Sequence, residues 1–341
     1  MIIVARILFS VVFWLSAMFA CQALALDHTQ LAVIINTADP LSVRIGNYYA
    51  VQRRIPSQNI IKVEFKPGIT SLPRHEFDAI KKTIDQKTRR IVQAYALTWA
   101  APYRVGCMSI TSALAFGFDP GYCADGCKAT RQSAYFNSPA LLPYAQHHVR
   151  PTMTIAATTF EQAKALIDRG IMSDASHPAA TAYLLSTSDK ARNVRSNSYP
   201  LIVKMLTNGP VRAYRIEQDA LRDAGDVLFY FTGKERVEGL QTLHFVPGAI
   251  ADHLTSVGGM LTDSTQMSAL RWLEAGATGS YGTVVEPCAI AQKFPNALIV
   301  IGRYLQGETL IEAYWKSVAM PGQGIFIGEP LAAPFRRKAM H

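Results

Sequence analysis

The sequence predicts an α/β protein, a three-layer sandwich in which a mostly parallel sheet lies between two layers of helices. Continuous apolar runs at 31–36 and 91–97, with an alternating run at 60–65 between them, are typical of strands in such a sheet. Helical patterns separate these runs. Strands that alternate with helices at this spacing pair in parallel through right-handed crossovers, which defines the fold class.

The same alternation continues along the chain. Further strands are predicted at 152–156, 182–185, 211–216 and 226–231, and helices at 160–167, 200–206, 297–305 and from Thr309 onward. Gly170 follows the helix at 160–167 and is expected to end it.

Residues 1–25 are predicted to be a cleavable signal peptide. Arg6 precedes an apolar run that is short for a membrane span, and a small-x-small pattern ends at Ala25. The mature chain would then start at Leu26, and the protein would be exported to the periplasm or the outside. An uncleaved anchor and a lipoprotein attached through Cys21 are the alternatives.

Residues 26–335 are interpreted as one elaborated domain, followed by a basic tail at 336–341. The sequence has neither an internal repeat nor a clear linker. Proline and glycine punctuate 100–150, which we interpret as an irregular insertion held by a disulfide. Because it follows a predicted strand, where open α/β sheets place their ligand crevices, it is either a lid or a stapled loop.

The charge distribution excludes a nucleic-acid-binding pattern. The formal net charge is +9, but the basic residues are scattered rather than interleaved with aromatic ones. Association with anionic envelope surfaces is one interpretation, and a solvated basic surface is the other. Walker, dinucleotide-binding, His-Glu-x-x-His and Gly-x-Ser-x-Gly motifs are absent, and the sequence indicates no cofactor and no metal.

Four cysteines follow the leader, and an even number in an exported chain indicates disulfides. The short spacing between Cys123 and Cys127 favours a bridge between these two, with a zinc half-site as the alternative. Cys107 and Cys288 would then pair with each other, or Cys288 would be a free thiol.

The stretch 247–288 holds most of the residues that could carry chemistry. The candidate catalytic residues are His253, Ser256 and Cys288, and the candidate binding residues are Lys234, Asp252, Thr255, Gly258, Gly259 and Glu286. The segment from Pro247 is either a helix or an extended strand, and 264–275 is predicted to be a helix. In neither geometry do neighbouring side chains form a complete triad.

Each candidate also has a structural interpretation. His253 would be a surface or hydrogen-bonding histidine, the paired glycines a tight turn, and Cys288 half of a disulfide or inert. A reactive thiolate at Cys288 would need a base or a positive neighbour, for which His253, His244 and Lys234 are the candidates.

The C-terminal third resembles gingipain-type, caspase-like cysteine peptidases. The blocks that carry the resemblance are Asp-Val-Leu-Phe-Tyr-Phe-Thr-Gly from Asp226, Gly-Ala-Thr-Gly from Gly276, the helix with Gly307, Thr309, Leu310 and Ala313, and Gly-Glu-Pro-Leu from Gly328. The whole mature chain also resembles an uncharacterised family of exported bacterial proteins with blocks similar to Ala-Asp-His-Leu-Thr-Ser from Ala251 and Leu-Ile-Asp-Arg-Gly from Leu166.

The first resemblance implies a caspase/gingipain-like fold with a catalytic histidine near Gly233 and Lys234 and a cysteine between Ser256 and Gly258. Neither residue is present there. Two functions therefore remain: a hydrolase of unknown substrate, or a non-catalytic envelope binding or assembly module that has kept the fold and lost the dyad.

Overall fold

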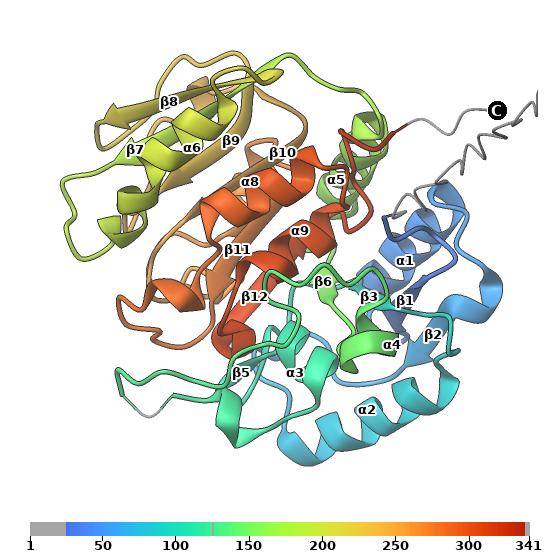
Figure 1. Ribbon diagram of the computed structural model, residues 1–341. Coiled ribbons are helices and arrows are strands. Elements are labelled where there is room, and N and C mark those ends of the chain that lie inside the picture. The colour runs from blue at the N-terminus through green and yellow to red at the C-terminus, as the bar shows by residue number, and fades with distance from the viewer. Residues whose placement is uncertain (1–24, 125, 338–341) are drawn as a thin grey trace, which may run out of the picture.

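The computed structural model describes residues 25–124 and 126–337, so the predicted leader, apart from Ala25, lies outside the described residues. Their centre is a ten-stranded sheet in the order β2-β1-β3-β6-β12-β11-β10-β9-β7-β8 (Figure 1). Its strands are β1 (Leu31–Asn36), β2 (Ile60–Val63), β3 (Ala94–Leu97), β6 (Thr152–Thr154), β7 (Ala180–Ser186), β8 (Val211–Glu217), β9 (Val227–Thr232), β10 (Phe245–His253), β11 (Gly279–Thr283) and β12 (Gly324–Gly328). The predicted α/β class and mostly parallel sheet are confirmed.

Two parallel halves that run in opposite directions make up this sheet. The strands β2, β1, β3, β6 and β12 run one way, and β11, β10, β9, β7 and β8 run the other way. The halves meet where β11 pairs with β12 in antiparallel register, from Gly279 opposite Gly328 to Thr283 opposite Gly324. The carboxyl ends of the two halves therefore lie at opposite edges.

Helices cover both faces of the sheet. The α-helices are α1 (Pro40–Gln52), α2 (Arg74–Lys87), α3 (Ile110–Phe116), α4 (Pro143–His147), α5 (Phe160–Ser173), α6 (Tyr199–Leu206), α7 (Leu270–Glu274), α8 (Ala297–Leu305) and α9 (Leu310–Ser317). Helices α6, α8 and α9 pack together over β8 and β12, while α1 and α5 pack on each other and against β1 and β10 (Figure 1). This arrangement produces the three layers, with the core on both sides of the sheet.

The central strands are buried on both faces, which explains their continuous apolar sequences. Every residue of β1 and β9 is buried. Capping residues define several helices: Thr159 and Gln162 form a capping box at the start of α5, and Thr309 and Glu312 form another at the start of α9.

Two local predictions are corrected, and one open alternative is decided. The segment from Pro247, for which the sequence allows a helix or an extended strand, is part of strand β10; a central strand buries both faces, so its apolar residues can mimic a helical stripe. The helix predicted at 264–275 is only α7, which begins at Leu270. Helix α5 passes through Gly170, where an added Cβ would lie 2.5 Å from Cγ of Glu329, so this glycine allows close packing instead of ending the helix.

The predicted insertion at 100–150 contains regular structure. The short strands β4 (Arg104–Val105) and β5 (Met108–Ser109) pair with each other, and α3 follows them across β6 and β12. In the described part of the chain, no helix has the length and apolarity that crossing a membrane requires.

Candidate functional site

A pocket lies at the edge of the sheet where β10 and β11 end. It encloses about 150 Å³ and is lined by Ala191, Arg192, Leu254, Thr255, Ser256, Glu286, Pro287, Cys288, Ala289 and Phe294. We call it the edge pocket. Its lining comes from the segments that follow β7, β10 and β11, at the carboxyl ends of parallel strands, where α/β sheets place their ligand sites.

Four of the predicted site residues line the edge pocket together: Thr255, Ser256, Glu286 and Cys288. The hydroxyl of Thr283 holds the backbone between β10 and the pocket, donating to the carbonyls of Ser256 at 2.8 Å and Thr255 at 3.1 Å. The two hydroxyl side chains of the pocket are therefore presented by a backbone anchored to β11.

His253 cannot act as a general base in this structure. The side chain is 2 % exposed, and both ring nitrogens are occupied: Trp272 Nε1 donates to Nδ1 at 2.9 Å, and Nε2 lies 3.1 Å from the carbonyl of Met267, to which it donates in the neutral tautomer. Burial lowers the pKa of His253 to about 3. These contacts favour the hydrogen-bonding interpretation of this histidine over the catalytic one.

Asp252 forms a buried ion pair with a residue that the sequence analysis did not select. Its carboxylate lies 2.5 Å from Arg195 Nη1, and the two side chains are 1 % and 4 % exposed. Arg195 also donates to the carbonyl of Thr232 at the end of β9. Burial raises the pKa of Asp252, and the guanidinium opposes that shift. Asp252 therefore holds the ends of β9 and β10 to the loop after β7, and it does not line the edge pocket.

Arg192 is the cation of the edge pocket. Its Nη1 lies 2.8 Å from Asp189, its Nη2 lies 3.7 Å from Glu235, and its Nε donates to the hydroxyl of Thr255 at 3.3 Å. The sequence feature that points to Arg192 is the group of polar residues directly after the strand predicted at 182–185.

Lys234 does not line the edge pocket. Its ammonium group lies 2.9 Å from Asp219, in a partly exposed ion pair. The preceding Gly233 has no room for a side chain, because an added Cβ would lie 1.9 Å from the carbonyl oxygen of Arg192. Strands β9 and β10 are parallel neighbours with Thr232 opposite His253, so the two positions that the resemblance assigns to a dyad follow adjacent strand ends.

The paired glycines pack against the neighbouring strand. Gly259 donates its N–H to the carbonyl of Thr283 at 2.9 Å, and an added Cβ would lie 2.7 Å from the carbonyl carbon of Gly282. Gly258 accepts a hydrogen bond from Ala269. Neither glycine lines the edge pocket, which favours close backbone packing as the reason for both.

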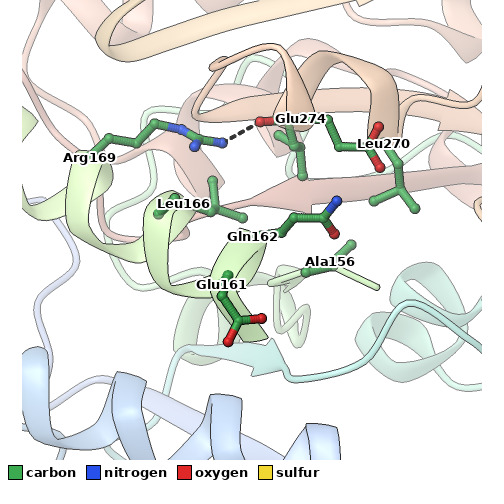
Figure 2. Close-up of a pocket in the computed structure, with 10 residues that line it drawn as sticks. Ala156, Glu161, Gln162, Leu166, Arg169, Leu270 and Glu274 are labelled. Atoms are coloured by element: carbon green, nitrogen blue, oxygen red, sulfur yellow. Dashed lines mark hydrogen bonds between the residues drawn. The ribbon is translucent and has the colours of Figure 1, made fainter. Parts of the chain in front are cut away.

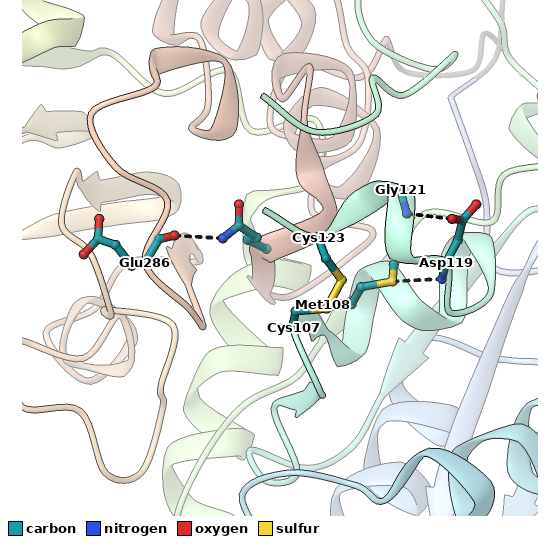
Figure 3. The surroundings of a disulfide bond; sticks show 7 residues. Cys107, Met108, Asp119, Gly121, Cys123 and Glu286 are labelled. Atoms are coloured by element: carbon teal, nitrogen blue, oxygen red, sulfur yellow. Dashed lines mark hydrogen bonds between the residues drawn. A yellow bond between two sulfur atoms is a disulfide. The ribbon is translucent and has the colours of Figure 1, made fainter. Parts of the chain in front are cut away.

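The cysteine pairing differs from the prediction. Cys107 is bonded to Cys123 and Cys127 to Cys288, so the predicted Cys123–Cys127 bridge is wrong. Figure 3 shows the first of these bridges, with Glu286 on a neighbouring segment. The second joins the insertion at 100–150 to the wall of the edge pocket, and it leaves Cys288 without a thiol for nucleophilic chemistry. Among the described residues, no group of three or more metal-binding side chains gathers.

A second pocket, which the sequence analysis missed, lies between α5 and α7. It encloses about 260 Å³, and Figure 2 shows Leu166 and Arg169 on α5 facing Leu270 and Glu274 on α7. Arg169 donates to the carbonyls of Leu273 and Ala277 and so satisfies the end of α7. Burial lowers the pKa of Arg169 to about 10. We interpret this arginine as a structural cap.

Comparison with solved structures supports the fold. The crystal structure of the Arg-specific cysteine proteinase gingipain R is similar over 90 % of this chain and 78 % of that one, with a TM-score of 0.50 and 12 % identity. Two more solved structures are also similar. One is described as a protease, with a TM-score of 0.47 and 10 % identity over 91 % of this chain and 79 % of that one. The other is a complex of pro- and mature domains of RgpB from Porphyromonas gingivalis, with a TM-score of 0.48 and 10 % identity over 89 % of this chain and 79 % of that one. No family model matches the sequence, and no curated protein matches it significantly. The chain has a caspase-like, gingipain-type fold, and at this identity the likeness extends to the fold alone.

Proposed function

We propose that this protein is an exported, non-catalytic module with a caspase-like fold that binds a polypeptide segment in its edge pocket. The observation that carries the proposal is the chemistry at the two dyad positions. Lys234 is paired with Asp219, and the region from Ser256 to Gly258 offers one hydroxyl. The nearby His253 is neutral and fully bonded, and Cys288 is in a disulfide. The pocket therefore has groups for recognition, while the histidine and the cysteine near the dyad positions are both engaged elsewhere.

The size of the edge pocket favours one side chain of a longer ligand. Its volume of about 150 Å³ is below the roughly 300–1,000 Å³ that is common for small-molecule sites. A polypeptide would place one side chain in the pocket and bind through its backbone outside it.

Charge favours a basic side chain. Arg192 already has carboxylate partners, whereas Glu286 is exposed and accepts one hydrogen bond, from the backbone nitrogen of Cys288 at 2.7 Å. Among the described residues, no cation comes within ion-pair distance of Glu286. The amine of Lys293 is buried and does not form an ion pair with Glu286 either. A lysine or arginine side chain of the ligand would supply the missing partner.

Pools of acetylated and amidated pentapeptides test the proposal. Their central residue is fixed as lysine, arginine, norleucine or glutamate, and binding to the oxidised protein is measured by fluorescence anisotropy. The lysine and arginine pools should bind most tightly. Glu286→Gln keeps an acceptor for the nitrogen of Cys288 and should weaken their binding by about 10-fold or more.

The matched control is Glu238→Gln, which removes an exposed carboxylate that is paired with Arg222 outside the pocket lining and should change binding little. Equal binding of the glutamate and lysine pools, or an unaltered affinity after Glu286→Gln, would show that the basic side chain does not bind there. Mass spectrometry of the same mixtures should detect no new peptide termini.

The hydrolase alternative depends on Ser256, which lines the edge pocket. A serine enzyme would react with a fluorophosphonate at this residue, and Ser256→Ala would abolish both the labelling and any peptide cleavage. We expect no labelling at Ser256 and no alkylation at Cys288 in the native protein. New peptide termini that Ser256→Ala abolishes would replace the binding proposal with an enzymatic one.

A further inference from the structure

The backbone of Leu26, the predicted first residue of the mature chain, is fixed at both polar groups. Its nitrogen donates to Oε2 of Glu312 at 3.1 Å, and its carbonyl accepts from Arg336 Nη2 at 2.9 Å. The side chain is 1 % exposed and belongs to the hydrophobic core, whereas Ala25 is partly exposed. The bond at the predicted cleavage site thus has one end docked in the domain.

Glu312 is a fully buried carboxylate on the first turn of α9. All of its hydrogen bonds converge on Oε2, which accepts from Leu26 N, from Thr309 N at 3.0 Å and from Thr309 Oγ1 at 2.6 Å. Its Oε1 is buried, and no donor among the described residues reaches it. These donors are all neutral, so burying the negative charge of Glu312 among them is energetically unfavourable.

The neighbouring cations serve another carboxylate. Lys316 Nζ lies 2.7 Å from Oε1 of Glu308, and Arg303 Nη1 lies 3.4 Å from the same oxygen. Arg336 contacts the carbonyl of Leu26, and within the described residues no basic side chain is at ion-pair distance from Glu312. A positive partner for Glu312 would therefore have to come from the group that is already bonded to it, the nitrogen of Leu26.

We propose that hydrolysis of the Ala25–Leu26 bond by a signal peptidase creates an α-ammonium group that binds Glu312 as a buried ion pair and completes the fold. Water adds across the bond: its oxygen joins the carbonyl carbon of Ala25, which leaves as a carboxylate, and both of its protons pass to the freed nitrogen of Leu26, which becomes an ammonium group. A neutral amide with one donor becomes a cation with three donors, enough for Oε2 and for the unpartnered Oε1. Near neutral pH an α-amino group is largely protonated.

The first test is the N-terminus of the exported protein. The full-length chain is produced with its own leader in a bacterial host, recovered from the periplasm and analysed by intact mass and N-terminal sequencing. The proposal requires a chain that begins at Leu26. A chain that retains the leader, or begins at another residue, overturns it.

The second test compares oxidised chains that start at Leu26 or at Ala25. Both starts follow the natural sequence, and Ala25 is accommodated in the structure, so the longer chain moves the ammonium group without adding a clash. Breaking a buried ion pair is costly, so the Ala25 start should raise the ratio of unfolded to folded protein by about 100-fold or more in urea unfolding. In Glu312→Gln chains the same extension should change this ratio less than about 3-fold.

Asp27→Asn is the matched control, because it removes a carboxylate next to Leu26 that does not bind its nitrogen, and the effect of the extension should persist. If Glu312→Gln chains do not fold, selective acetylation of the Leu26 amine decides the matter, since it removes the charge and leaves one N–H donor. Equal stability of the two starts, or of the free and acetylated chains, overturns the proposal.

Discussion

The two disulfides should differ in how much they stabilise the protein, because they close loops of very different length. Cys127 and Cys288 are 161 positions apart, whereas Cys107 and Cys123 are 16 apart, and the two loops do not overlap. Loop-closure entropy gives about 5 kcal/mol for the long loop and about 3 kcal/mol for the short one. Replacing both cysteines of a pair by serine should therefore cost about 2 kcal/mol more for the long loop.

The unaltered protein and the two double-serine variants are unfolded in urea under oxidising conditions and followed by far-ultraviolet circular dichroism. The differences in the free energy of unfolding give the stability lost with each disulfide. The pair at Cys127 and Cys288 also joins the insertion to the wall of the edge pocket, so its removal should weaken peptide binding, whereas the other pair should leave binding nearly unchanged. Equal losses of stability, or a larger loss for the short loop, would refute the entropic reasoning. Mass spectrometry of non-reduced digests checks the pairing itself.

Three further predictions concern the end of β10. Arg195→Met leaves Asp252 buried without its cation and should cost about 3–5 kcal/mol in urea unfolding, and adding Asp252→Leu should recover most of that loss. His253 has a folded-state pKa of about 3, below its ordinary 6.5, so the stability it contributes is complete above pH 6.5 and is lost progressively as the pH falls from 6.5 towards 3. Its imidazole nitrogen shifts should remain those of a neutral ring at pH 5, and a ring that titrates near 6.5 would contradict this. Gly259→Ala should cost about 1–3 kcal/mol because its Cβ would overlap β11, while Gly225→Ala, which has open space around it, should stay within about 0.5 kcal/mol.

The strands could be predicted from the sequence because most of them are short and buried on both faces. The run that ends at Phe231 corresponds to β9, and the run at 31–36 corresponds to β1. The reversal of direction at β11 and β12 could not be predicted, since strand direction depends on how distant segments meet and not on local pattern. The strand β10 was ambiguous for a related reason: when both faces are buried, alternation disappears.

The position of the candidate site was predictable, and its chemistry was not. Residues after β10 and β11 line the edge pocket because carboxyl ends of parallel strands meet at one edge. Whether His253 is a base depends on Trp272 and Met267, which lie 19 and 14 positions along the chain. Cysteine pairing depends on the same kind of distant contact, so spacing alone favoured the wrong bridge.

The histidine and the cysteine at this edge are both engaged in stabilising contacts. A histidine that receives one hydrogen bond and donates another in a buried site is held neutral, and a disulfide sulfur has no thiolate. The groups that remain exposed to the edge pocket are a hydroxyl, a guanidinium with carboxylate partners and the carboxylate of Glu286. Under the proposed function, these groups would discriminate ligands by charge and hydrogen bonding.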